Sequence, residues 1–470
     1  MPRFRAARSR CTPFLSALLC IAGCAHYTPK PLEPAKSLET LQARRLDDPA
    51  VLERLRALNI LAPTDKQWGR TQLLIAALNL SPKVAEARAV LAQSIAAGTT
   101  ARELENPALS LSSEYDLTRA AESPWLWGLA TSFLTDTFAS RGTRIDLAAA
   151  NTRAARSDFE ETLWTVRKDL RNALLALEID TRRVALLEQG VSIREQLLRL
   201  ANARVQAGAS PRAEALQSEL ELSRSRAALD DARSRLADGR SRLAGALGVP
   251  AAALTGLELR FEELDAPPPI EPDQFSALRE QALLSRADLA RAIADYDARE
   301  LDLKQQMGAR YLQFSAGPGY VYDHGIRKLT LGASVLLPVF NQNQGPIAEA
   351  FAAREAAGRH AEAVQAAVFT EIEAARQAYD AALSALTRAR AQRQTSESMA
   401  RAARRALELD ATDRPSVLAA EASANTDRLV ELDALDRAQQ ALGALEDAVR
   451  TPLSGPERGL VLQNLTTADH

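Results

Sequence analysis

An internal duplication of the sequence limits the folds that are open to this 470-residue chain. When the chain is shifted by about 202 to 205 residues, blocks along its whole length match in one order. The matching blocks are residues 77–89 with 282–294, 109–115 with 314–320, Gly142 with Gly345, 208–219 with 410–421, and 243–250 with 445–452. Identity within each pair is modest, but the nearly constant offset predicts two halves of one plan. The proline-rich segment DAPPPIEPD (265–273) between them is typical of a linker.

Each half has the same succession of predicted elements. A helix of about 30 residues comes first, near 70–100 and again near 275–308, and two strand-like segments follow it. A long helix, near 143–207 or 346–409, then leads through a turn into a shorter helix. At the α-helical rise each long helix spans about 95 Å, which is far deeper than a globular core. Few aromatics (5%) and abundant Ala, Leu, Glu and Arg agree with rods packed side by side, as in a coiled coil.

The strand-like segments alternate apolar and polar residues. In residues 107–117, leucines such as Leu109 and Leu111 alternate with serines and acids, and residues 328–338 repeat the pattern. Each segment has about 9 to 13 residues, the length that a tilted strand needs to cross a bilayer. Soluble hairpins with one buried face are the alternative.

Four such strands cannot close a barrel alone, and lipid tolerates no open sheet edge. A dimer would supply eight strands and a trimer twelve. An eight-stranded barrel is filled by its own side chains, whereas twelve strands leave a lumen. The strand pattern therefore favours a homotrimer that contacts outer-membrane lipid.

The N-terminus is predicted to be an export signal. Arginines precede a short apolar core, FLSALLCIAG, which is too short to span a bilayer as a helix. It ends in IAGC, which resembles the lipobox of bacterial lipoproteins, so Cys24 is the predicted site of diacylation, for instance by palmitate. All three cysteines lie at or before this position, so the mature chain has no internal disulfide. An ordinary signal that happens to contain a cysteine is the alternative.

The sequence as a whole resembles the TolC-type outer-membrane factor (outer membrane efflux protein) family, in its lipoprotein form. The resemblance rests on IAGC, the doubled helix–hairpin–helix plan, NPALSLSSEY (106–115) and LLPVFNQNQGPIAEA (336–350). The last motif is similar to the heavy-metal branch, whose members pair with resistance-nodulation-division pumps. The family implies a mainly α fold with a transmembrane β part. In it, a trimer forms a twelve-strand outer-membrane β-barrel that continues into a twelve-helix periplasmic α-barrel.

The resemblance implies an exit duct without enzymatic activity or cofactor. Such a duct passively conducts substrates, heavy-metal cations among them, from an inner-membrane efflux pump and a periplasmic adaptor across the outer membrane. It would be lipid-anchored in the outer membrane of a Gram-negative bacterium and extend into the periplasm. The alternative is a lipoprotein adaptor or scaffold with long periplasmic hairpins and no pore.

The expected boundaries follow from the repeat. They are a signal peptide at 1–23, a lipid-anchored extended segment at 24–66, a first repeat at 67–262, a linker at 263–274, a second repeat at 275–452 and a tail at 453–470. Strands are expected at about 107–118, 125–137, 310–323 and 328–339. The longer helices are expected at about 143–207, 212–247, 346–409 and 414–449.

The turns between the long and short helices are the expected periplasmic end of the duct. Gly208 suits a left-handed helix stop, and Ser210 and Thr412 are the expected N-caps. In a trimer, Asp410 and Asp413 would form carboxylate rings around the aperture. An N-cap role is the alternative for Asp413.

The strand-to-helix joints are expected at Gly142 in the first half, and at Pro338 and Gly345 in the second. There the Asn/Gln-rich run NQNQ is expected to satisfy backbone groups rather than to bind a ligand. Four scattered histidines, with no zinc spacing, phosphate loop or nucleophile motif, give no catalytic or metal site. A net charge of −2 gives no indication of nucleic-acid binding.

Overall fold

The computed structural model describes residues 27–63, 66–118, 123–135, 140–310, 314–335, 337 and 339–459. The chain divides into two compact units after Ala43. In the first unit, α2 (Pro34–Ala43) is exposed along its whole length. The expected signal peptide and Cys24 lie outside the described residues. All other elements belong to the second unit.

The second unit contains the same order of elements twice. The first half consists of α4 (Arg70–Leu80), α5 (Pro82–Arg102), β2 (Ala108–Tyr115), β3 (Trp125–Thr135), α6 (Ser140–Gln206) and α7 (Arg212–Leu247). The second half consists of α8 (Pro272–Ser285), α9 (Ala287–Gly308), β5 (Phe314–Asp323), β6 (Ile326–Val335), α10 (Gln344–Glu408) and α11 (Arg414–Val449). Short elements around them are α3 (Pro49–Ala57), β1 (Gln67–Trp68), η1 (Ala251–Leu254), β4 (Glu258–Leu259) and η2 (Pro456–Gly459). The sequence repeat is thus a repeat of structure.

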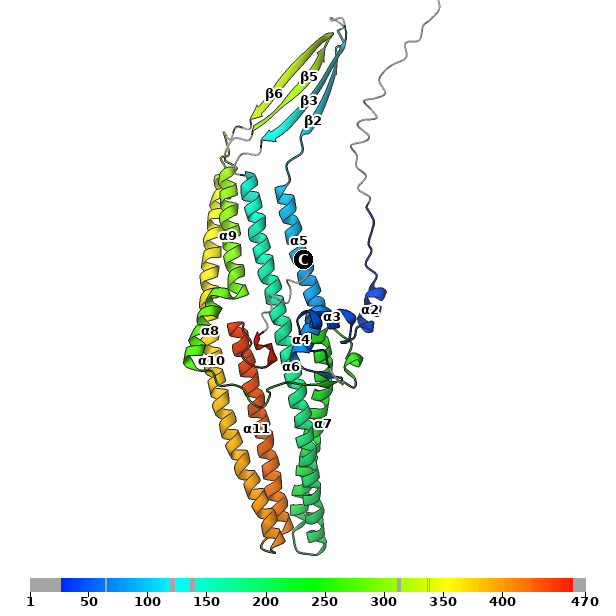
Figure 1. Cartoon of the computed structure of the whole chain (residues 1–470), viewed down its shortest axis with the longest axis vertical. Coiled ribbons are helices and arrows are strands. Elements are labelled where there is room, and N and C mark those ends of the chain that lie inside the picture. The colour runs from blue at the N-terminus through cyan, green and yellow to red at the C-terminus, as the bar shows by residue number, and fades with distance from the viewer. Residues whose placement is uncertain are drawn as a thin grey trace, which may run out of the picture. The chain divides into compact units, whose positions relative to one another are not determined.

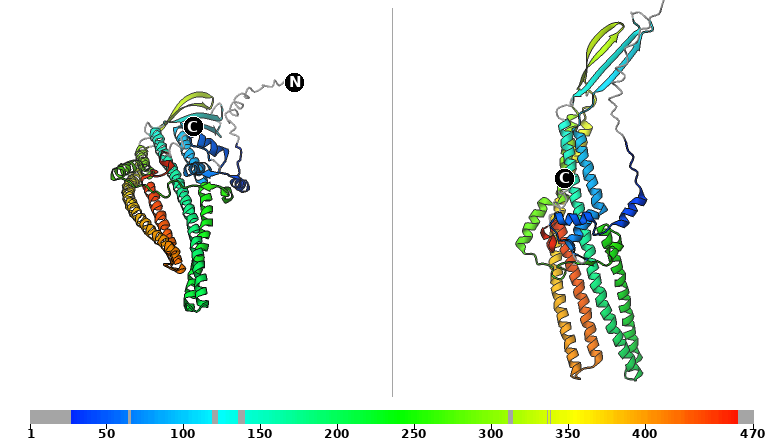
Figure 2. Two further views of the ribbon diagram at one scale, coloured as in Figure 1. Left: turned by 60° about the horizontal axis from the view of Figure 1, so that its bottom comes forward. Right: turned by 45° about the vertical axis from the view of Figure 1, so that its right-hand side comes forward.

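The longest helices, α6 and α10, have 67 and 65 residues, so each spans about 100 Å. Helix α6 packs along α7, and α10 packs along α11. Both helix–turn–helix tips lie at the end of this unit opposite the four-stranded sheet (Figure 1 and Figure 2). Among the described residues, no helix combines the length and the apolar composition needed to cross a membrane.

The expected single helices near 70–100 and 275–308 are each divided in two, so that prediction was wrong. In the first half the break falls at Ser81, whose backbone is extended (ψ 124°) and precedes Pro82. Proline has no N–H to donate and disfavours the helical region for the residue before it. In the second half the break falls at Arg286 (ψ 137°), whose buried guanidinium is held by carboxylate partners.

The expected extended segment at 24–66 is not extended throughout, because it contains α2 and α3. Asp48 caps α3 by accepting a hydrogen bond from the Ala50 N–H (3.0 Å), and Pro49 occupies the first helical position. Val51 of this helix is fully buried. The apolar residues of α3 therefore belong to the folded core.

The main hydrophobic core surrounds α4, whose residues 73–78 are all apolar and buried. It packs against Leu163, Leu170 and Leu174 of α6 and against the C-terminal end of α7. Trp68 of β1 joins this core, and β1 pairs in parallel with β4. A second, smaller core joins α8, α10 and α11.

Candidate functional site

The four-stranded antiparallel sheet has one apolar and one polar face. Its order is β2-β3-β5-β6, and directly paired residues, such as Leu111 with Leu129, point to the same side. This register confirms that apolar residues at alternate positions of the paired strands, such as Leu109 and Leu111, share one face. The apolar face consists of Leu109, Leu111, Tyr115, Trp125, Trp127, Leu129, Phe133, Phe314, Tyr320, Tyr322, Leu329, Leu331 and Val335.

The apolar face is exposed. Leu111, Leu329 and Leu331 expose 71%, 86% and 82% of their surface. A continuous exposed apolar surface marks contact with lipid or with another protein. The opposite face carries mainly small and polar residues, namely Ser110, Ser112, Glu114, Gly128, Ala130, Ser132, Ser315, Gly317, Gly319, Lys328, Thr330, Gly332 and Ser334.

The two outer strands lack a partner on one side. Within the described residues, β2 pairs only with β3, and β6 pairs only with β5. Such an edge presents a row of backbone N–H and C=O groups that pair readily with another strand. The sheet is therefore incomplete as it stands in a single copy.

The end of β2 and the start of β3 form the end of the sheet that is farthest from the helices (Figure 1), and an aromatic cluster lies there. The ring centroids of Tyr115 and Trp125 are 4.7 Å apart in an edge-on arrangement, and those of Trp125 and Trp127 are 5.4 Å apart and stacked. Tyrosine and tryptophan are enriched where a membrane meets water, because one end of each ring system is polar.

The joint before α10 is held by side-chain amides, as the sequence suggested. Asn343, the N-cap residue, has a left-handed backbone (φ 63°), and its Nδ2 donates to the Gln306 carbonyl near the end of α9 (2.8 Å). Asn341 Oδ1 accepts from the Asn343 N–H (2.8 Å). Gly345, the expected bend, is instead the second residue of α10. Asparagine takes the bend because it tolerates the left-handed region and can also bond the neighbouring helix. Pro338 lies outside the described residues.

The joint before α6 uses arginines. Arg141 Nη2 donates to the Arg102 carbonyl (2.7 Å), and Arg144 Nε donates to the Ala101 carbonyl (3.2 Å), so both satisfy the end of α5. Gly142, the expected bend, is the third residue of α6. The expected bend is therefore not at Gly142, because the helix already begins at Ser140.

The two helix–turn–helix tips have the same backbone. Gly208 and Asp410 both adopt the left-handed conformation, with φ of 68° and 53°. The next N–H reaches back to a carbonyl of the last helical turn, Ala209 to Arg204 and Ala411 to Ala406, at 2.8 Å in each case. Both helices thus end in the bonding pattern of a Schellman motif.

Neither Ser210 nor Thr412 is an N-cap, so both predictions were wrong. The N-cap of α7 is Pro211, which makes no side-chain cap bond. The N-cap of α11 is Asp413, whose Oδ1 accepts from the Ser416 N–H (3.0 Å). Hydrogen bonds from Ser416 hold the pKa of Asp413 below its ordinary value. The helices themselves begin at Arg212 and Arg414, as the expected bounds had them, so only the N-cap residues lie one position later than expected.

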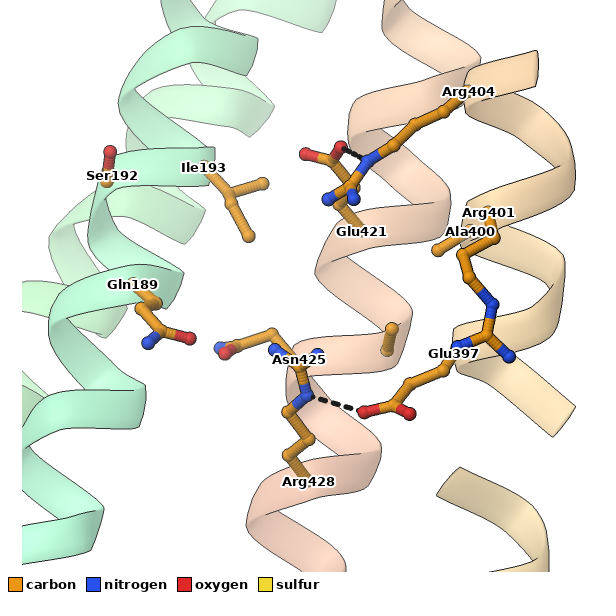
Figure 3. A pocket seen from close by; sticks show the side chains of 11 residues that line it. Gln189, Ser192, Ile193, Glu397, Ala400, Arg401, Arg404, Glu421, Asn425 and Arg428 are labelled. Carbon is orange, nitrogen blue, oxygen red and sulfur yellow. Dashed lines mark hydrogen bonds and ion pairs between the residues drawn. The ribbon is translucent and has the colours of Figure 1, made fainter. Parts of the chain in front are cut away.

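A cavity of about 440 Å³ lies between α6 and the α10–α11 hairpin (Figure 3). Arg404 Nε donates to Glu421 (2.6 Å) and Arg428 Nε to Glu397 (2.9 Å), and both pairs join α10 to α11. The buried Asn425 donates to a backbone carbonyl of α6 (3.2 Å). These contacts tie the second hairpin to itself and to the first.

A network of buried charges, which the sequence analysis missed, joins the halves in the middle of the rods. Arg167 of α6 donates to Glu446 of α11 (2.9 Å) and to Glu457 of η2 (2.8 Å). Arg70 of α4 and Arg171 of α6 add ion pairs of 3.3 Å to Glu457 and Glu446, respectively. Each of these five side chains exposes at most 4% of its surface.

Glu446 is held ionised at the centre of this network. Its other carboxylate oxygen accepts from the N–H groups of Leu453 (2.8 Å) and Ser454 (3.1 Å). Burial raises the pKa of a carboxyl group, but the guanidinium groups of Arg167 and Arg171 outweigh it and lower the pKa of Glu446. Burial lowers the pKa of Arg171 to about 10.

The sequence held a partial signal for this network. Arg167 and Arg171 lie at helical spacing with Leu163, Leu170 and Leu174, on the side of α6 that becomes buried. Charged side chains on such a side are buried only when they are paired. The two partners of Arg167 are 279 and 290 residues away, so spacing alone cannot identify them.

Within the described ranges, no group of His, Cys, Asp and Glu side chains is arranged to hold a metal ion. His324 lies in the turn between β5 and β6, with Nδ1 2.7 Å from Asp323 Oδ1. The positions that the structure brings together are thus the sheet, the joints, the tips and the buried charge network.

Comparison with known proteins relates both the sequence and the fold to outer-membrane channels. Residues 73–249 match the family described as outer membrane efflux protein. No curated protein matches the chain. A membrane protein from Pseudomonas aeruginosa has a similar structure, with a TM-score of 0.67 and 20% identity over 82% of this chain and 94% of that one.

Two named outer-membrane proteins have a similar fold. The outer membrane protein VceC of Vibrio cholerae is 17% identical, with a TM-score of 0.65 over 81% of this chain and 95% of that one. The open state of the Neisseria gonorrhoeae MtrE outer membrane channel is 15% identical, with a TM-score of 0.66 over 82% and 89%. By sequence, residues 73–249 therefore match the outer membrane efflux protein family, and about four fifths of the chain has the fold of these outer-membrane proteins.

Proposed function

We propose that this chain is the outer-membrane exit duct of a tripartite efflux system. The observation that carries the proposal is a four-stranded sheet with an exposed apolar face and two unpaired edges, attached to α-helical rods of about 100 Å. Lipid suits the apolar face, but it excludes unpaired strand edges. Several copies must therefore close one barrel.

The number of copies is three in this proposal. Two copies would give eight strands, and a barrel of that size is filled by its own side chains. Three copies give twelve strands and leave a lumen, lined by the serines, glycines and threonines of the polar face. The rods of the same three subunits would continue as a periplasmic barrel of twelve helices.

Partners follow from the proposed arrangement. The duct itself has no energy source, so an inner-membrane pump of the resistance-nodulation-division type drives export, and a periplasmic adaptor docks at the helical tips. Acylated Cys24 anchors the N-terminus in outer-membrane lipid. The resemblance of residues 336–350 to the heavy-metal branch supports heavy-metal cations as cargo. Because the pump supplies the energy in this arrangement, conduction through the barrel is passive.

The proposal is tested by reconstitution of the full-length protein. We expect trimers that dissociate only on heating in detergent, and stepwise ion conductance in planar bilayers. Leu331→Arg on the apolar face should abolish insertion, because a charge facing lipid costs about 2–4 kcal/mol at the bilayer midplane. The neighbouring Thr330→Arg on the polar face is the matched control and should still insert. A monomer without conductance, released by removing the lipid anchor, would instead support the non-pore scaffold.

The acidic residues at the second tip carry a narrower proposal. In a trimer Asp410 and Asp413 line the periplasmic aperture, and their carboxylates bind divalent cations there. Asp410→Asn with Asp413→Ser removes both charges but retains residues that suit the left-handed position and the N-cap. Conductance should rise, or block by divalent cations should weaken. Unchanged conductance and block would place the aperture elsewhere.

A further inference from the structure

The unpaired edges of the sheet also specify how the copies would meet, an inference that rests on the proposed duct. We propose that β6 of one subunit pairs antiparallel with β2 of the next in a single register, with Leu329 opposite Tyr115 of the partner subunit. The barrel is incomplete without this contact. The direction of the backbone groups, the overlap of the strands, the tilt of the barrel and the charges each reduce the number of possible registers.

The direction of the backbone groups fixes which residues can bond across the contact. The Asp116 N–H donates to the Pro124 carbonyl (2.7 Å), so even-numbered residues of β2 bond to β3 and odd-numbered ones face outwards. On the other edge, a two-residue turn joins Asp323 to Ile326, which makes them a hydrogen-bonded pair. Even-numbered residues of β6 therefore bond to β5. Odd-numbered residues must meet odd-numbered residues between subunits.

The side chains impose the same rule independently. The apolar face contains the odd-numbered residues of both edge strands, for example Leu109 of β2 and Leu329 of β6. A shift by one residue would place polar residues of one subunit beside apolar residues of the next. Pairing of odd with odd keeps the apolar face continuous around the barrel.

The overlap of the two strands fixes the direction of the stagger, which is the shift along the strand between one subunit and the next. Within one subunit, Leu111, Leu129, Tyr320 and Leu329 lie opposite one another in consecutive strands. If Leu329 met Leu109 of the partner subunit or an earlier residue, half or more of β6 would face residues that precede β2, and residues 103–107 form no strand in the structure. A closed barrel also needs a stagger, which excludes Leu111 of the partner subunit. Leu329 must therefore meet a partner residue after Leu111.

Barrel geometry leaves two registers. For twelve strands about 4.8 Å apart with a rise of about 3.3 Å per residue, a stagger of two, four or six residues per subunit tilts the strands by about 19°, 35° or 46°. Membrane barrels tilt by about 35–45°. The partner residue opposite Leu329 is then Tyr115 or Leu117.

The number of paired residues and the charges select Tyr115 of the partner subunit as the residue opposite Leu329. That register pairs seven consecutive residues of the two strands, from Leu329 with the partner's Tyr115 to Val335 with the partner's Leu109. The alternative pairs only five within the strands. The selected register also sets Lys328 opposite the partner's Asp116, an opposite-charge pair of the kind that stabilises neighbouring strands. In the alternative register, Lys328 faces Thr118 of the partner subunit.

Disulfide trapping in the full-length protein tests the register. Gly332→Cys with Ser112→Cys creates a directly opposed pair on the polar face, with Cα atoms about 4.5 Å apart. Gly332→Cys with Ser110→Cys, and with Glu114→Cys, are the matched controls. In the proposed register their Cα atoms are about 7–8 Å apart, at or beyond the reach of a disulfide. Variants with a single new cysteine report any pairing with the native cysteines.

After oxidation in membranes, covalent dimers and trimers should form with Ser112→Cys in about fivefold or greater yield than with either control. Higher yield with Ser110→Cys or Glu114→Cys overturns the register but retains the barrel. A disulfide confined to single chains overturns both the register and the proposed duct. If no pair links while heat-dissociable trimers still conduct, the edges meet differently and the register alone is wrong.

Discussion

The two halves of the chain reach the same backbone with different residues. Helices α7 and α11 both have 36 residues, and each is bounded by two left-handed positions. In the first half both positions are glycine, Gly208 and Gly248, whereas in the second they are Asp410 and Arg450. Glycine adopts this conformation without steric strain, while other residues require compensating contacts. The repeat therefore preserved the geometry of the helix ends rather than their residues.

The two halves also differ in how many of their residues are buried. Nine of the eleven residues of α4 are buried, but only Ala282 of its counterpart α8. The first half thus provides most of the main core, and the second half packs against it through α11. The buried charges Arg167, Arg171 and Glu446 lie at this contact. A duplicated chain can thus specialise where its two copies meet.

The largest expected effect comes from breaking that contact. Glu446→Ala leaves the guanidinium groups of Arg167 and Arg171 buried without their shared carboxylate. Removal of one partner from a buried ion pair costs about 3–5 kcal/mol. The free energy of unfolding, from denaturant titration followed by circular dichroism, measures it. The exposed Glu214→Ala, which removes an ion pair with Arg204, is the control and should change stability by less than about 0.5 kcal/mol. Equal effects would mean that the network contributes little.

The same network predicts a dependence on pH. The pKa of Glu446 is lowered in the folded state, so its stabilising effect is present above the ordinary glutamate pKa of about 4.3. It is lost as the pH falls through the lower folded value. The melting temperature of the wild type should fall more steeply than that of Glu446→Gln below about pH 4.5. Parallel curves would contradict a lowered pKa.

Much of the fold followed from sequence patterns because those patterns are local. Alternation at Leu109 and Leu111, and helical spacing at Leu170 and Leu174, each depend on near neighbours. The duplication predicted the paired plan and the equivalence of the two tips. The N-cap residues were harder to predict. Ser210 is a good N-cap by residue type but does not cap its helix, whereas Asp413 does, because the backbone conformation decides which of two neighbouring residues takes the N-cap position.

The parts that could not be predicted depend on distant partners. Arg286 divides α8 from α9 because its guanidinium reaches Glu371 and the Ala448 carbonyl, 85 and 162 residues away. No local signal at Arg286 indicates those partners. The second joint bends at Asn343 rather than Gly345, because the end of α9 offers the Gln306 carbonyl to an asparagine side chain. A contact with another part of the chain, rather than local conformational propensity, decides which residue makes the bend.

A moderate effect is expected where the halves end their shorter helices. At Gly248 an added Cβ would lie 2.6 Å from the Leu80 carbonyl oxygen, and φ is 73°. Gly248→Ala should therefore cost about 2 kcal/mol, in the range for backbone strain. At the equivalent position Arg450 pairs with Glu161 (2.6 Å) and lies 5.8 Å from the Trp164 ring centre.

Arg450→Gly relieves the left-handed strain but loses both contacts. Because the gain and the loss are each about 1 kcal/mol, the net change should stay within about 1 kcal/mol. Thermal unfolding of both variants measures the contrast with Gly248→Ala. If Arg450→Gly stabilised the protein by more than this, the side chain of Arg450 would not be anchored as described.

The smallest effect is expected at the tips, where both positions are open. Nothing lies within 4 Å of a Cβ added at Gly208, so Gly208→Ala should cost only the left-handed penalty of about 1 kcal/mol. Asp410→Gly should change stability by less than about 0.5 kcal/mol, because aspartate tolerates this region and glycine gains entropy when unfolded.

A tip can open without global unfolding, so amide hydrogen exchange at Ala209 and Ala411 is the sensitive measurement. Exchange should quicken at Ala209 in Gly208→Ala and stay near the wild-type rate at Ala411 in Asp410→Gly. Asp410→Asn separates the loss of charge from the backbone effect, since asparagine keeps the left-handed tolerance. If both alanine amides exchange at wild-type rates in every variant, then the left-handed residues do not set the stability of the tips, and the equivalence of the two halves ends at their shared geometry.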